Sequence, residues 1–285
     1  MSAVGLAPMK AALVTAAFLF GVTGCAAPDS LGTLQQVTVK ARARGFAVSE
    51  IKAGEFRLVA YLRNPDQPAE SLAIYVEGDG APWPTPFQPP RDPTPLKPMS
   101  LALAVGDPLP AVAYLGRPCQ YLEASDLRQC DSAYWVERRF APEVIEAYDA
   151  AVSQLKRSYQ ARRIRLIGYS GGGVIATLLA MRRNDVDLLV TVAAPLALAE
   201  WVAWHGASPL SGSLDPAAAQ QGSFLPASVH LVGGHDRTVP AAIVESFVRH
   251  QGGRVEVVPD FDHDCCWARD WEHLLGRLLV QENRQ

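Results

Sequence analysis

The sequence predicts an α/β fold in which a mostly parallel central sheet is covered by helices on both faces. From about Gly45 onward, short apolar runs alternate with longer segments whose apolar residues recur at helical spacing. Most of the short runs stop at glycine, proline or aspartate, as strands that enter loops commonly do. The chain has 285 residues, 49% of them hydrophobic, which is enough for one large core. We therefore expect a single domain over residues 45–285.

The first half of this region contains four predicted strands. "FAVSEIK" and "RLVAYLR" predict an opening pair joined by the turn "AGE", and "LAIYVEGDG", residues 72–80, predicts a buried strand that stops at glycines. Ten of the 22 prolines lie between residues 81 and 110. No regular element is expected over residues 81–97, because proline removes N–H donors and breaks helices. A short helix near residues 99–105 and a strand at residues 111–116 are expected to follow.

The second half alternates more regularly. Residues 142–159 predict an amphipathic helix with Pro142 in its first turn. Its apolar positions at helical spacing are Val144, Ile145, Tyr148, Val152 and Leu155. Further strands are expected at residues 163–170, 187–195, 228–234 and 254–259, further helices at 171–183, 240–253 and 267–281, and a helix or cap segment from Glu200.

The N-terminus predicts export. Lys10 precedes the apolar run from Ala11 to Thr23, which is shorter than the ~20 residues that span a bilayer and is typical of a signal peptide. The run ends in "VTGC", which resembles the bacterial lipobox and implies cleavage before Cys25 and acylation of that residue. Residues 1–24 are then the signal peptide and residues 25–44 a lipidated tether, and Ala26 suggests an outer-membrane protein facing the periplasm. The alternative is an ordinary secretory signal with a coincidental cysteine.

Four cysteines remain if Cys25 carries lipid, and an even number in an exported chain suggests disulfides. Cys119 and Cys130 bracket a short loop, so a local bridge there is the simplest pairing. That pairing leaves Cys265 and Cys266 as a bridge between neighbours or as two free thiols. A cross-link from the 119–130 segment to the loop of Cys265 and Cys266 is the rival pairing.

One motif points to nucleophilic catalysis. "GYSGG", residues 168–172, follows a predicted strand and precedes a predicted helix, as the G-x-S-x-G nucleophile elbow requires. The glycines let strand and helix approach closely, and the helix N-terminus directs its dipole at Ser170. A phosphate-binding loop of the P-loop type is excluded, because no lysine follows the glycines.

At this point the chain resembles the α/β-hydrolase superfamily, over about residues 46–281. It looks most like bacterial lipoprotein members, whose "EGDG", "DPTP", "GRPCQY" and "RFAPEV" segments are echoed here. The resemblance implies the α/β-hydrolase fold and the chain order Ser, Asp, His for a catalytic triad. Asp236 matches the acid in a G-x-x-D-x-x-V-P setting, and the alternative reading is an Asp that caps the helix after Pro240. His263 follows the last strand as the expected base, with His235 as the only nearby rival.

The oxyanion hole requires two backbone donors. The first is the N–H of Gly171, and by alignment the second is that of Asp79, with Gly80 as the alternative. An acidic side chain beside an oxyanion would oppose the reaction, so we expect the Asp79 carboxylate to point toward a cation such as Arg91 or Arg117.

Together these features predict a lipid-anchored, esterase-like serine hydrolase of the cell envelope that cleaves an ester, thioester or amide without a cofactor. The expected partners are a small ester or acyl substrate and a membrane. Nucleic acid is not expected, because the net charge is −3 and no basic stripe is visible. A non-catalytic envelope lipoprotein on the same scaffold is the alternative. A metal or thiol enzyme built on residues 262–266 is disfavoured, because adjacent cysteines do not have metal-ligand spacing.

Overall fold

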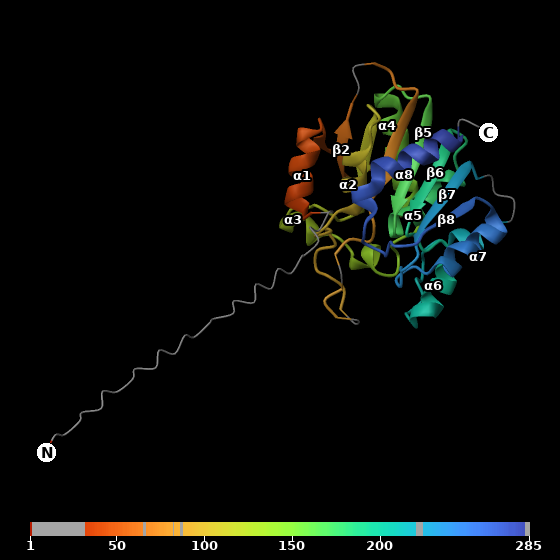
Figure 1. Ribbon diagram of the computed structural model, residues 1–285. Helices are drawn as coiled ribbons and strands as arrows, with labels where there is room; N and C mark the ends of the chain where they lie inside the picture. The colour runs from red at the N-terminus through yellow and green to blue at the C-terminus, as the bar shows by residue number, and fades with distance from the viewer. Residues whose placement is uncertain (2–31, 65–66, 82, 86–87, 221–224, 283–285) are drawn as a thin grey trace.

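An eight-stranded sheet forms the centre of the protein in the computed structural model, which describes residues 32–64, 67–81, 83–85, 88–220 and 225–282 together with Met1 (Figure 1). The strand order is β1-β2-β4-β3-β5-β6-β7-β8. The strands are β1 (Ala47–Ala53), β2 (Phe56–Arg63), β3 (Ser71–Val76), β4 (Val112–Leu115), β5 (Arg163–Tyr169), β6 (Val186–Val192), β7 (Ala227–Gly233) and β8 (Arg254–Val258). Cys25 and the predicted signal peptide lie outside the described residues.

The sheet is mostly parallel, as the sequence predicted. β2 pairs antiparallel with β1 and with β4, whereas all pairs from β4 through β3 to β8 are parallel. In the centre, Val76 of β3 lies opposite Gly168 of β5, and Tyr169 lies opposite Val192 of β6. The carboxyl ends of these parallel strands therefore meet at one edge of the sheet, where α/β proteins bind their ligands.

Two layers of helices cover the sheet (Figure 1). The helices are α1 (Leu34–Ala43), α2 (Met99–Gly106), α3 (Ala124–Leu127), α4 (Pro142–Ser158), α5 (Gly171–Ala180), α6 (Leu198–His205), α7 (Ala241–Gln251) and α8 (Trp267–Glu282), with short 3₁₀ turns η1 (Ser132–Trp135) and η2 (Pro216–Ala218). Alternation along β3 serves both layers: Leu72, Ile74 and Val76 pack with α4 and α5, whereas Ala73 and Tyr75 pack with α2 and α8. No helix in the described part of the chain has the length and apolar character needed to span a membrane.

The prediction of a tether up to Arg44 is wrong for residues 34–43, which form α1. Thr33 and Gln36 form a reciprocal capping box at its start, and Val37 and Ala41 are buried in the core. The Leu34 N–H also donates to the Leu96 carbonyl at 2.8 Å. The folded domain therefore begins before Gly45, because a capped helix with two buried side chains is part of the core rather than a linker.

His230 of β7 is a histidine whose side chain is shielded from water. Its side chain is fully buried, its Nδ1 lies 2.9 Å from Thr191 Oγ1, and its ring packs edge-on against Phe247. Its Nε2 has no hydrogen-bond partner among the described residues. Burial lowers the pKa of His230 to about 3 from an ordinary value of 6.5. The native state therefore holds this imidazole neutral in mildly acidic solution, whereas the unfolded chain protonates it.

We expect the free energy of unfolding to fall as the pH decreases below 6.5, because the unfolded state then binds a proton that the native state does not. Each pH unit costs at most about 1.4 kcal/mol through this group, or roughly 2 kcal/mol between pH 6.5 and 4.5. Urea unfolding across this range should show a shallower pH dependence for His230→Gln than for the wild type. The exposed His250 provides the control, and His250→Gln should keep the wild-type slope. Equal slopes in all three proteins would contradict the assignment.

Candidate active site

Ser170 stands on the sharp turn between β5 and α5. Its backbone has φ 50° and ψ −126°, a conformation that is rare for any residue other than glycine. Its N–H donates to the Val192 carbonyl at 2.8 Å, and its carbonyl accepts from the Gly173 N–H at 2.9 Å. The turn is thus fixed from both sides, with the serine directly before the first residue of α5.

The glycines on either side of Ser170 are required by packing. A Cβ on Gly168 would overlap the backbone of Gly172, and a Cβ on Gly172 would overlap the carbonyls of Val76 and Glu77. Only backbone atoms occupy these positions, so no side-chain movement can make room. The first turn of α5 therefore lies directly against the end of β3. This close approach brings the loop after β3, which contains Asp79, next to the turn after β5, which contains Ser170.

The structure brings the three predicted triad residues into one hydrogen-bonded chain. Ser170 Oγ lies 3.2 Å from His263 Nε2, and His263 Nδ1 lies 2.9 Å from Asp236 Oδ2. The Asp236 side chain is fully buried and that of His263 is 17% exposed. His235, the rival base, is exposed and does not occupy this position. The arrangement can transfer a proton from the serine to the imidazole while the carboxylate accepts from the other ring nitrogen.

Asp236 uses its second oxygen to shape its own loop. Oδ1 accepts from the N–H groups of Thr238 and Val239 at 2.8 and 2.7 Å, just before α7 begins. Asp236 does not cap α7, because the N-cap of that helix is Pro240 and no side chain caps it; the carboxylate closes the preceding turn instead. Oδ2 remains directed at His263 because Oδ1 is held by the backbone.

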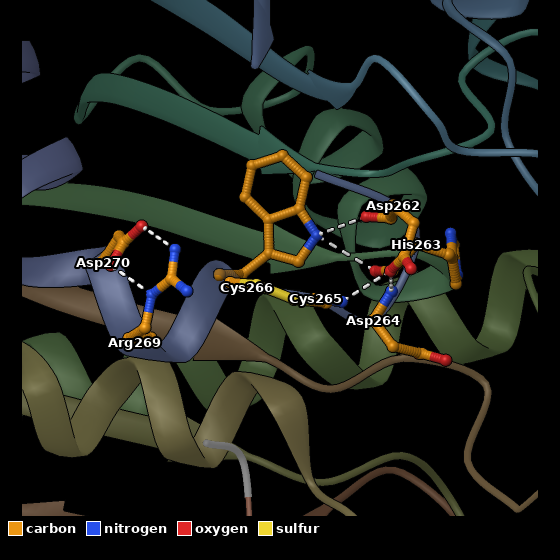
Figure 2. Close-up of a disulfide and its surroundings, with 8 residues drawn as sticks. Asp262, His263, Asp264, Cys265, Cys266, Arg269 and Asp270 are labelled. Carbon is orange, nitrogen blue, oxygen red and sulfur yellow. Dashed lines mark hydrogen bonds and ion pairs between the residues drawn. A yellow bond between two sulfur atoms is a disulfide. The ribbon is translucent and has the colours of Figure 1, made fainter. Parts of the chain in front are cut away.

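The His263 loop is held by hydrogen bonds within the loop and from neighbouring side chains (Figure 2). Asp262 Oδ1 accepts from the N–H groups of Asp264 and Cys265 at 2.9 and 2.7 Å. The carbonyl of His263 accepts from Tyr169 Oη at 3.2 Å and from Trp267 Nε1 at 3.0 Å. Tyr169 occupies the first variable position of the G-x-S-x-G motif, and its ring centroid lies 5.3 Å from that of His263. Tyr169, which directly precedes Ser170, thus also holds His263 in place.

Both cysteine pairs form disulfides between near neighbours in the chain. Cys119 and Cys130 are bridged with their Cα atoms 6.1 Å apart, and Cys265 is bridged to Cys266 directly before α8 (Figure 2). The rival cross-link between the two regions is therefore not formed. Each bridge lies beside a loop of the site: one next to the segment around Arg117, the other next to His263.

The loop after β3 places Asp79 beside Gly171. The N–H groups of Asp79 and Gly171 donate to no acceptor among the described residues, as expected for donors kept for a ligand.

Glu77 is buried, and its carboxylate accepts from the N–H groups of Gly78 and Ser100 and from Tyr114 Oη. Burial raises the pKa of Glu77, although these hydrogen bonds oppose the shift.

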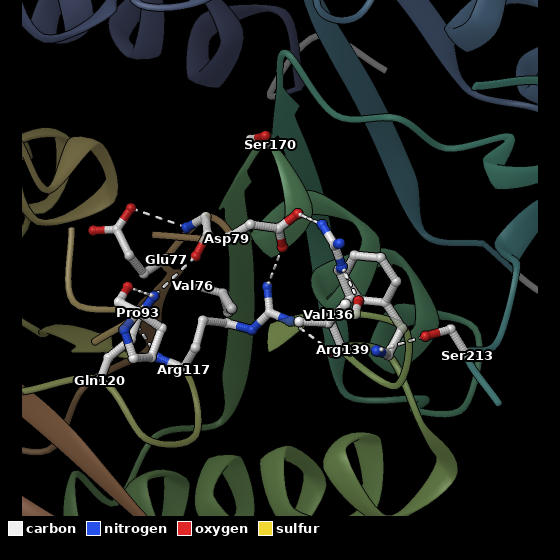
Figure 3. A network of polar contacts seen from close by, with 12 residues as sticks. Val76, Glu77, Asp79, Pro93, Arg117, Gln120, Val136, Arg139, Ser170 and Ser213 are labelled. Atoms are coloured by element: carbon white, nitrogen blue, oxygen red, sulfur yellow. Dashed lines mark hydrogen bonds and ion pairs between the residues drawn. The ribbon is translucent and has the colours of Figure 1, made fainter. Parts of the chain in front are cut away.

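The Asp79 carboxylate lies between two guanidinium groups (Figure 3). Oδ1 accepts from Arg117 Nη1 at 2.9 Å and Oδ2 from Arg139 Nη1 at 2.6 Å. Burial acts to raise the pKa of Asp79, but Arg139 and Arg117 outweigh it and lower that pKa below its ordinary value. Arg117 is one of the two expected partners. Arg91, the other expected partner, is exposed instead, and the second guanidinium at Asp79 belongs to Arg139.

Four segments that carried the sequence resemblance converge on this loop. In "GRPCQY", Gln120 Nε2 donates to the carbonyls of Gly78 and Pro93, and Tyr121 N–H donates to Thr94 Oγ1 of "DPTP". "RFAPEV" supplies Arg139 and starts α4, whose N1 residue is proline. "EGDG" ends at Gly80, whose φ of 96° and close contact with the Pro93 carbonyl both exclude a side chain. These segments therefore build one supported turn rather than four separate features.

Three other histidines lie away from the Ser170 site, and no metal-binding cluster is found among the described residues. Within the ranges that the structure describes, no group of three or more His, Cys, Asp or Glu side chains is arranged to hold a metal ion. His205 Nε2 contacts the Thr238 carbonyl at 2.8 Å, His230 is buried in the sheet, and His250 lies on α7. The site is accordingly formed by the residues at the carboxyl ends of β3, β5, β7 and β8.

The chain has the α/β-hydrolase fold. Est1E from Butyrivibrio proteoclasticus superposes with a TM-score of 0.56 at 15% identity, over 84% of this chain and 99% of that one. An esterase from Pyrococcus furiosus gives 0.58 at 15%, over 83% and 92%. A bacterial membrane phospholipase A described as a virulence factor gives 0.58 at 14%, over 88% and 91%. No protein-family model and no curated protein sequence matches the chain.

Gly172→Ala is expected to destabilise the protein by about 2–4 kcal/mol, because the new methyl group would overlap two backbone carbonyls at the end of β3. Gly276→Ala is the matched control. Gly276 lies in α8 with open space around its Cα, so alanine there should stabilise by up to ~1 kcal/mol through helix propensity. Urea unfolding of both variants measures the difference. A Gly172→Ala protein as stable as the wild type would show that β3 and α5 are not packed as described.

Proposed function

We propose that this protein is a serine hydrolase that cleaves a carboxylic ester through an acyl-enzyme. The observation that carries the proposal is the continuous chain from Ser170 through His263 to Asp236, built on a strained turn at the N-terminus of a helix. Nucleophile and base lie within hydrogen-bond reach, and the base is oriented by a third group. The fold that the chain shares with esterases adds support, although fold alone does not determine activity.

The reaction proceeds in two halves. Ser170 Oγ attacks the ester carbonyl carbon while its proton passes to His263 Nε2, which gives a tetrahedral oxyanion. Collapse of this intermediate breaks the bond to the alkoxy oxygen, and the imidazolium returns the proton to the departing alcohol. Water then attacks the acyl-serine with His263 again as base, releasing the carboxylic acid and free Ser170. No cofactor takes part in this sequence.

Electrostatics favour the charges that form on this path. The buried Asp236 carboxylate stabilises the imidazolium, and its geometry fixes the tautomer with the proton on Nδ1. The oxyanion is assigned to the N–H groups of Gly171 and Asp79, which have no other acceptor among the described residues. Gly171 is also the first residue of α5, so the positive end of the helix dipole lies beside the developing charge.

Ser170→Ala is expected to lower kcat/KM for short-chain p-nitrophenyl esters by at least about a thousandfold and to abolish labelling by a fluorophosphonate probe. His263→Ala should have a similar effect, and Asp236→Asn should lower kcat by about 10³–10⁴-fold because the tautomer is no longer fixed. Esters of increasing acyl length, a thioester and an anilide, each run against Ser170→Ala, would identify the acyl class. Folded wild-type protein that is neither labelled nor active on any of these substrates would favour the non-catalytic alternative.

We also propose that the protein is anchored to the bacterial cell envelope by lipid on Cys25, facing the periplasm from the outer membrane. The support is the apolar run that ends in "VTGC". Cells grown with an alkyne fatty acid should incorporate the label into the wild type and not into Cys25→Ser, and only the wild type should enter a detergent phase. Multiple acyl chains give durable anchoring, because each buried CH₂ contributes about 0.8 kcal/mol. Labelling that persists in Cys25→Ser would contradict this proposal.

A further inference from the structure

The carboxylate of Asp79 lies where a negative charge would oppose the proposed reaction. A Cβ on Gly171 would overlap Asp79 Oδ1, so the carboxylate packs directly against the residue whose N–H is assigned to the oxyanion. The same Cβ would lie 3.1 Å from Arg117 Nη1. A charge this close to the reacting carbonyl changes the free energy of the oxyanion far more in a partly buried site than it would in water.

Two arginines reverse the sign of the charge at this position. Arg117 and Arg139 each donate to one oxygen of the Asp79 carboxylate, and their side chains are only 4% and 10% exposed. Salt screens buried charges weakly, so their effect on the neighbouring site persists at physiological ionic strength. The cluster of Asp79, Arg117 and Arg139 carries a net charge of +1. This charge lies next to Gly171, the first residue of α5.

Both guanidinium groups are held in place by further contacts. Arg117 Nη2 donates to the carbonyl of Arg139 at 2.6 Å, and its guanidinium lies 5.2 Å from the centre of the Phe140 ring. Arg139 Nε donates to the Val136 carbonyl at 2.5 Å. The positive charges therefore cannot turn away to solvent, and the backbone of Asp79 is tied through its own side chain to two fixed groups (Figure 3).

We propose that Arg117 and Arg139 are positioning residues that act on the oxyanion site through the Asp79 carboxylate, by keeping the net charge of the cluster of Asp79, Arg117 and Arg139 positive. This inference rests on the proposed hydrolase function and extends it to residues that do not touch the substrate. Its specific consequence is that kcat follows the net charge of the cluster. A purely structural role for the arginines would instead make kcat follow the integrity of the ion pairs.

Arg139→Met tests this consequence, because it leaves the cluster neutral while keeping an apolar stem of similar length. We expect kcat for p-nitrophenyl acetate to fall by about 10–100-fold with KM changed by less than about threefold, since the loss falls on the transition state. The double variant Asp79→Asn/Arg139→Met restores one net positive charge. It should regain kcat to within about fivefold of the wild type, although both ion pairs of the cluster are absent from it.

Three controls separate charge from structure. Arg138→Met removes the neighbouring exposed arginine, which pairs with Glu143 instead, and should keep kcat within about twofold. Arg139→Lys retains the charge but loses the fork of donors, and should stay within about fivefold of the wild type even if Arg139→Met proves insoluble. Inhibition by a trifluoromethyl ketone, which forms an oxyanion on Ser170, should weaken in Arg139→Met in proportion to kcat/KM and recover in the double variant.

The outcomes distinguish the inference from the function on which it rests. Wild-type turnover that does not depend on Ser170 removes the proposed function and this inference with it. Turnover that depends on Ser170, with a double variant no faster than Arg139→Met, overturns the inference alone. An Arg139→Lys protein as slow as Arg139→Met does the same, because the charge would then be present without effect. Recovery in the double variant together with an active Arg139→Lys supports the role of the cluster.

Discussion

The close approach of the β3 end to the first turn of α5 is the constraint on which the site depends. Gly168 and Gly172 have no side chains that would separate these elements. The tight turn between them places Ser170 at a positive φ. The same contact places Gly171 beside the loop of Asp79, so one close approach positions both Ser170 and the two N–H groups proposed to bind the oxyanion. Backbone strain at Ser170 is tolerated because the surrounding sheet and helix fix both of its neighbours.

A second close approach joins the other two loops of the site. A Cβ on Gly233 would lie near the Phe261 carbonyl, and the N–H of His235 donates to that same carbonyl at 2.8 Å. The loop that contains Asp236 and the loop that contains His263 are thus joined by backbone contacts, in addition to the contact between their side chains. The 2.9 Å bond between the two side chains follows from this backbone arrangement, with Tyr169 and Trp267 holding the far side of the histidine loop.

Sequence reasoning reached the parallel sheet and the three residues that the structure joins, because strand-end position and chain order are local features. It placed α1 in a tether, although the Thr33 and Gln36 capping box was readable, because no apolar run marked the helix. It missed Arg139, which lies 60 residues from Asp79 and is joined to it only by the fold. The signal was present in "RFAPEV", but pairing across such distances is set by tertiary packing rather than by propensity or spacing.

The loop that follows Asp79 is closed at its base. The N–H of Ala81 donates to the Pro93 carbonyl at 3.1 Å, and Gln120 also binds that carbonyl. Among the described residues, Gly78 is contacted by Glu77 and Gln120, and Gly80 lies against Pro93 and Gln120 at this base. Lengthening a loop costs only about 0.6 kcal/mol per doubling once its ends are fixed. The exposed residues 83–85 of this loop can therefore vary in sequence and length at little cost, while the contacts at the base keep the Asp79 turn in place.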